Sequence, residues 1–87
     1  MTERMNAIQD RLLDHMNDPD PTPAGVLATF EDAHATMREV AALVDSYREQ
    51  PNVSVPDDLQ QAIALGAGFG VLMQRVKAHL DGVTRRV

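Results

Sequence analysis

Residues 59–87 read LQQAIALGAGFGVLMQRVKAHLDGVTRRV, and this stretch decides the predicted fold. Apolar or small side chains recur along it in alternating steps of three and four, which is the spacing of one buried face of a helix. The pattern passes through three closely spaced glycines without a break, so we predict one helix over about 57–85. We call such a line of apolar or small side chains along one helix face a seam. The members of this seam are Leu59, Ala62, Gly66, Phe69, Met73, Val76, Leu80, Val83 and Val87.

The glycines of this stretch, Gly66, Gly68 and Gly70, need an explanation. Each glycine in a helix interior costs about 1 kcal/mol relative to alanine. Ala62, Gly66 and Gly70 are four residues apart and share one stripe, where missing side chains let another helix approach closely. We therefore predict that Ala62, Gly66 and Gly70 form a helix contact that offsets part of the cost.

A second seam follows Thr22-Pro23, a capping threonine before a proline at the first helical position. Its apolar side chains repeat in steps of four and three over three heptads, which predicts a long helix over about 23–49. The members of the seam are Val26, Phe30, Ala33, Met37, Val40, Val44 and Tyr47.

A short N-terminal helix is predicted over about 3–16, with Met5, Ile8 and Leu12 on its apolar face. The segment DPDPTP at 18–23 ends it, because each proline removes a backbone donor and restricts the residue before it. The segment QPNVSVP at 50–56 separates the two long helices in the same way.

The predicted fold is all-α, in one domain of 87 residues. Two long helices joined by a short break fold back on each other, so we expect an antiparallel hairpin of about 23–49 and 57–85 plus the short N-terminal helix. The short helix either docks on its own hairpin or swaps to another subunit. Aromatic residues are too few for a β-sandwich or barrel. The expected core is Val26, Phe30, Met37, Val40, Val44, Phe69, Met73, Val76 and Leu80.

Apolar side chains outside the seams exceed what a monomer of this size covers easily. We predict that they form an association surface and that the protein is a homodimer, in which two hairpins pack together to complete a bundle. These side chains are Leu27, Leu43, Ile63, Leu65 and Leu72.

The net charge is −5, which argues against a general nucleic-acid binder because such proteins neutralise phosphates with a basic surface. An antiparallel hairpin places Glu31 and Asp32 beside Arg75 and Lys77, so we predict intramolecular ion pairs there. The basic segment RVKAHLDGVTRR at 75–86 nevertheless keeps one alternative open, a regulator that contacts nucleic acid through the end of the last helix.

The sequence offers little catalytic or metal-binding chemistry. There is no cysteine, which excludes disulfides and thiolate ligands. Glu31 and His34 have the spacing of a ligand pair in a ferritin-like bundle, but residues 59–80 contain no acid to complete a site, so we interpret the pair as exposed. The glycine-rich GAGFG lacks the strand, lysine and hydroxyl of a phosphate-binding loop. We predict no enzyme activity, no cofactor and no metal.

The turn QPNVSVPDDL, followed by a long helix that ends in VKAHLDGVTRRV, resembles the layout of type III secretion needle subunits. Those proteins are of this length, lack cysteine and form a helical hairpin around a proline-bracketed turn. The resemblance implies, as an alternative function, a secretion-apparatus subunit that assembles into a fibre. The chain departs from the family at 62–73, which is apolar and glycine-rich where the needle helix is polar and rich in Tyr and Asn.

The leading functional prediction is a non-enzymatic helical interaction module: a small adaptor, a chaperone-like subunit, or a bacterial or phage regulator. It would contact copies of itself and a further protein partner through its helix faces. The longest apolar run, 62–73, is about twelve residues where a membrane span needs about twenty. With no secretory signal visible, we expect a soluble, cytoplasmic protein.

Overall fold

The computed structural model describes residues 1–85, which form three α-helices. Helix α1 spans Thr2–Asn17, α2 spans Pro23–Arg48 and α3 spans Asp57–Arg85. The all-α prediction is confirmed, and each helix end lies within one residue of its predicted position. Arg86 and Val87, the last position of the predicted seam, lie outside the described residues.

Local sequence chemistry explains where α2 and α3 begin. The side-chain oxygen of Thr22 accepts a hydrogen bond from the Gly25 N–H at 3.2 Å, and Pro23 follows as the first helical residue. In α3, Asp57 and Asp58 occupy the first turn, where carboxylates favour the positive end of the helix dipole. Helix α3 then continues through its glycines without interruption, and no glycine among residues 1–85 has a positive φ.

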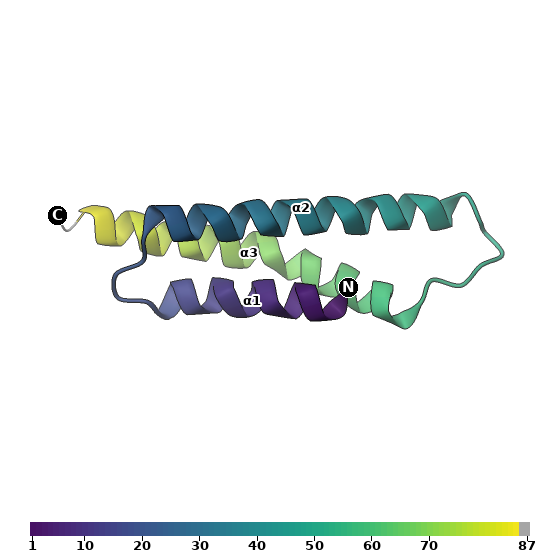
Figure 1. Cartoon of the computed structure of the whole chain (residues 1–87), viewed down its shortest axis with the longest axis horizontal. Helices are drawn as coiled ribbons and strands as arrows, with labels where there is room; N and C mark the ends of the chain where they lie inside the picture. Colours follow the sequence, from purple (N-terminus) through teal and green to yellow (C-terminus); the bar gives the residue numbers. More distant parts are fainter. Residues whose placement is uncertain (86–87) are drawn as a thin grey trace.

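The three helices form an elongated bundle of 56 × 17 × 16 Å. Helices α1 and α3 run in the same direction, and α2 runs antiparallel to both (Figure 1). Helices α2 and α3 diverge toward the loop that joins them, and the N-terminal end of α1 lies beside the first turns of α3 (Figure 1). The predicted hairpin with a short N-terminal helix is therefore confirmed, and α1 packs more extensively on α3 than α2 does.

The core is a line of apolar side chains to which each helix contributes one stripe. Four residues expected there, Val26, Val40, Phe69 and Val76, are buried. The other expected residues, Phe30, Met37, Val44, Met73 and Leu80, are partly buried against this line. The complete buried apolar set is Met5, Ile8, Leu12, Val26, Ala33, Val40, Leu59, Ala62, Phe69 and Val76.

Two buried threonines in α2 were not expected in the core. Thr29 is 1% exposed and Thr36 is 2% exposed. Each hydroxyl donates to the backbone carbonyl four residues earlier: Thr29 to Gly25 at 3.1 Å, and Thr36 to Asp32 at 2.8 Å. The threonine oxygens then accept hydrogen bonds from α1. The α2 face that meets α1 is consequently polar in part.

Side chains of α1 supply these donors. His15 Nε2 lies 2.8 Å from the Thr29 hydroxyl oxygen, and an Arg4 guanidinium nitrogen lies 3.3 Å from the Thr36 oxygen. Because each threonine has already committed its own hydrogen, the α1 groups act as the donors. The two contacts lie about three turns apart on α1 and about two turns apart on α2, and they fix α1 along α2.

Candidate functional site: an apolar groove between α2 and α3

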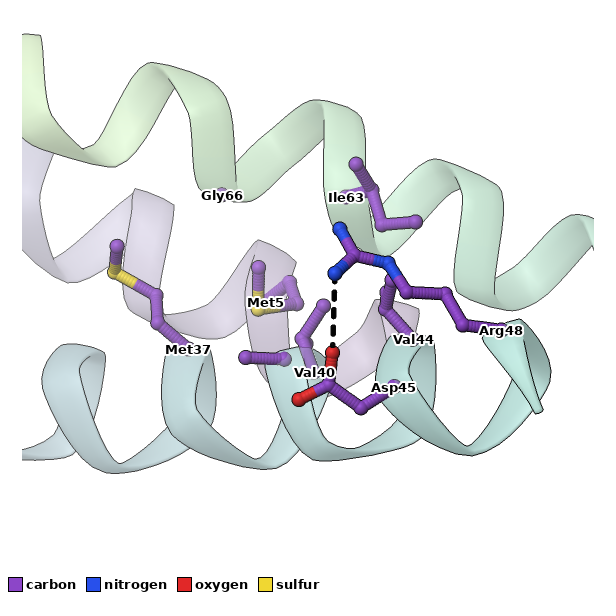
Figure 2. Close-up of a pocket in the computed structure, with 9 residues that line it drawn as sticks. Met5, Met37, Val40, Val44, Asp45, Arg48, Ile63 and Gly66 are labelled. Carbon is purple, nitrogen blue, oxygen red and sulfur yellow. Dashed lines mark ion pairs between the residues drawn. The ribbon is translucent and has the colours of Figure 1, made fainter.

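The divergence of α2 and α3 leaves an open groove of about 260 Å³ on one side of the bundle. Figure 2 shows side chains from all three helices converging on it. Met5 of α1 lies at its base and is 0% exposed, while Ile63 of α3 stands at one edge and is 42% exposed. The lining residues are Met5, Met37, Val40, Ala41, Val44, Asp45, Arg48, Ile63 and Gly66.

The chemistry of the groove is apolar, with charge only along its α2 edge. There the Arg48 guanidinium and the Asp45 carboxylate lie 3.5 Å apart, an exposed pair drawn as a dashed line in Figure 2. Met5 and Met37 are unbranched and adapt to the shape of a neighbour. An open apolar groove between two helices is the usual docking place for the apolar face of another helix.

The predicted helix-contact residues, Ala62, Gly66 and Gly70, are in three different environments. Ala62 is fully buried. A Cβ on Gly66 would lie 3.3 Å from Met5 Cε, so the side chain that uses the space above Gly66 comes from α1. Gly70 is exposed, and a Cβ there would meet nothing within 4 Å. The close approach is thus local to Gly66.

The predicted association residues are divided among several faces. Ile63 lines the groove, and Leu27, 58% exposed, precedes Ala41 by fourteen residues and so shares its side of α2. Leu65 and Leu72 pack, partly buried, against the core. Leu43 is 41% exposed but is not part of the groove.

The ion pairs differ from those predicted between α2 and α3. Asp32 pairs with Arg11 of α1 at 2.7 Å instead of with Arg75 or Lys77. The physical reason is position, since Asp32 lies one turn from both Thr29 and Thr36 and therefore faces α1 with them. Within residues 1–85, Arg75, Lys77 and Glu31 are exposed and form no ion pair.

A second, more polar groove of about 320 Å³ lies between α1 and α2. Its charged groups are paired: Arg4 contacts Glu39 at 2.5 Å, as Arg11 contacts Asp32. The hydrogen bond from Arg4 lowers the pKa of Glu39, and the same bond raises the pKa of Arg4. Because each arginine is neutralised by its own acid, this groove offers no surplus charge to hold an ion.

The described part of the chain shows neither a metal site nor a membrane span. Residues 1–85 hold no group of three or more His, Cys, Asp or Glu side chains placed to bind a metal ion. Glu31 and His34 are both exposed. None of the three helices combines the length and apolarity that crossing a bilayer demands.

Sequence reasoning missed the groove as a site, although part of its lining was visible in the spacing. Met37, Ala41, Val44 and Arg48 follow one another in steps of four, three and four, so they share a side of α2. The position of Met5 in the groove could not be predicted from residue spacing, because it depends on where α1 docks.

The protein-family models contain no match to this chain, and neither the curated proteins nor the solved structures contain one.

Proposed function

We propose that this protein is a non-enzymatic helical assembly module, which works by docking helix faces against copies of itself and against a further protein partner. The observation that supports the proposal is the open apolar groove between α2 and α3. Helices α2 and α3 both pack against α1 and leave this side of the bundle uncovered, and an open apolar groove of this kind suits the apolar face of a fourth helix.

The energetics favour covering the groove. Apolar surface removed from water stabilises an assembly by about 25 cal/mol per Å². Ile63, 42% exposed, lies at the edge of the groove and would lose contact with water under another helix. A domain of 87 residues gains little net stability from a single core, so association also adds to its stability.

The test compares two exposed apolar residues of α3. Ile63→Asp puts a charge at the edge of the groove, whereas Val71→Asp puts one on α3 outside the groove, where Val71 is 53% exposed. We expect the parent and the Val71 variant to sediment as dimers at micromolar concentration and the Ile63 variant to shift toward monomer. Circular dichroism would check that both variants remain helical.

A parent protein that sediments as a 9.6 kDa monomer would contradict the proposal. Large, polydisperse species would instead favour the needle-like alternative, since fibres grow without a defined end.

A nucleic-acid regulator remains a second candidate because of one observation on α3. Arg75 and Lys77 are exposed and are not neutralised by an acid elsewhere in residues 1–85. Retardation of DNA or RNA in a gel at low salt, lost at high salt, would support this candidate over the assembly module.

A further inference from the structure

We propose that the groove is occupied by a second copy of this chain, whose α2 lies antiparallel to the first α2 across a two-fold axis beside Ala41. The inference rests on the self-association proposed above and adds the partner and the register. Two-fold dimers are the commonest oligomers of soluble proteins, and their interface is one patch meeting itself. The patch must therefore be complementary to its own rotated image.

The charges beside the groove have this property. Asp45 lines the groove, and Arg38 precedes it by seven residues on the same side of α2. Seven residues span about 10 Å along a helix, so Arg38 and Asp45 are too far apart to pair within one chain. Arg38 is exposed and has no ion-pair partner among residues 1–85.

Ala41 lies almost midway between these two charges and lines the groove. A two-fold axis beside Ala41 relates the two antiparallel α2 helices. A residue three or four positions before the axis in one copy therefore lies opposite a residue three or four positions after it in the other copy. Arg38 of one copy then faces Asp45 of the other, and symmetry produces the same pair twice. The short side chains of Ala41 and Ala42, both exposed, allow two α2 helices to approach at the axis.

The extent of the groove along α2 agrees with this register. With the axis beside Ala41, the Met37 to Val44 segment of each copy lies over the groove of the other, because the groove is lined from Met37 to Arg48. Asp45 would gain the partner's Arg38 while keeping its own Arg48 at 3.5 Å. Two hairpins joined in this way give four long helices around a shared apolar interior.

A competing register exists and serves as the control. Glu31 lies seven residues before Arg38 on the same side of α2, and it is exposed and without an ion pair in the described chain. An axis near residues 34 and 35 would pair Glu31 with Arg38. That axis would place the partner's Ala24 opposite Asp45, so Asp45 would gain no cation from the other copy.

The experiment is a charge exchange between copies, followed by analytical ultracentrifugation. Arg38→Asp alone and Asp45→Arg alone each place like charges opposite each other twice per dimer, so each should weaken dimerisation about tenfold or more. An equimolar mixture of the two single variants should restore a heterodimer, and the double variant should restore a homodimer. Glu31→Arg alone should leave the dimer unchanged.

The outcomes separate this inference from the proposed function. A monomeric parent protein would overturn both. A dimeric parent whose single variants are not restored by mixing would overturn the two-fold register and leave the assembly module standing. If Glu31→Arg, and not Asp45→Arg, restored dimerisation of the Arg38→Asp variant, the axis would lie near residue 34. That result would overturn the placement beside Ala41.

Discussion

Met5 is the side chain through which α1, the groove and the glycine-rich part of α3 meet. It is fully buried, lies at the base of the groove, and its methyl group occupies space that a side chain at position 66 would need. The missing side chain of Gly66 thus makes room for α1. Gly68 and Gly70 have no such neighbour, and nothing in the structure explains why they are glycine.

Alanine substitutions should distinguish Gly66 from Gly68. Gly68→Ala should raise the free energy of unfolding by about 1 kcal/mol, because alanine favours the helix and its Cβ meets nothing within 4 Å. Gly66→Ala should gain clearly less, since its Cβ would press on Met5 at 3.3 Å. Urea denaturation measures both, and equal gains would mean that Met5 does not constrain position 66.

The hydroxyl of Thr29 gives a second comparison at the level of single residues. Thr29→Val keeps the shape but leaves the His15 ring nitrogen without its acceptor at 2.8 Å, so we expect a loss of about 1 kcal/mol in unfolding free energy. Thr84→Val is the matched control. The Thr84 hydroxyl also donates to a carbonyl four residues earlier, at 2.9 Å, but it is exposed and accepts nothing from another helix. If both variants lost the same unfolding free energy, the effect would come from the hydroxyl's bond to the carbonyl four residues earlier, and not from the bond to His15.

At the scale of elements, α1 is held in two chemically different ways. Toward α2 it presents Arg4, Arg11 and His15, which bond to acids and threonines. Toward α3 it presents apolar side chains such as Met5, and at its first turn it bonds to α3 through Thr2. The backbone N–H of Thr2 donates to Asp58 Oδ1 at 3.1 Å, and its hydroxyl also contacts this carboxylate. The first turn of α1 is therefore joined to the first turn of α3 by hydrogen bonds.

This junction predicts a dependence of stability on pH. The side-chain hydrogen bond from Thr2, with the backbone bond beside it, holds the pKa of Asp58 below its ordinary value of 3.8. A carboxyl with a depressed folded pKa contributes stability above its unfolded pKa and loses it as the pH falls through the folded value. The melting temperature should therefore drop below about pH 4, and Asp58→Asn should flatten that drop.

Asp57→Asn is the neighbouring control, since Asp57 lies in the same first turn and has no hydrogen bond to α1. Thermal melts followed by circular dichroism between about pH 2.5 and 6 would compare the three proteins. If Asp57→Asn flattened the curve as much as Asp58→Asn, the helix dipole would explain the effect in place of the junction with α1.

At the scale of the whole molecule, helix content and chain path were predictable because they depend on local signals. The apolar spacing of three and four residues from Leu59 to Val76 predicted a continuous helix despite the cost of its glycines. Thr22-Pro23 predicted the first residue of α2 correctly. The hairpin followed from two long helices and a short turn. The sequence also indicated that exposed apolar groups such as Ile63 would remain.

The placement of α1 could not be predicted in the same way. Thr29 and Thr36 read as polar in a seam analysis, yet they are buried because their hydroxyls are satisfied both within α2 and by α1. Once α1 lies on that face, Arg11 reaches Asp32, and the expected pairing with Arg75 is replaced. The groove depends further on the angle between α2 and α3, which no residue spacing encodes.

The parallel pairing of α1 with α3 has a kinetic consequence. The helix contact that is most extensive joins segments far apart in sequence, as the bond between Thr2 and Asp58 across 56 positions illustrates. Bringing such distant segments together costs chain entropy before the contact repays it. Refolding should accordingly be slower than for a simple helical hairpin, whose contacts are local. We expect the last step to be the docking of α1 on α3, and not the formation of any helix.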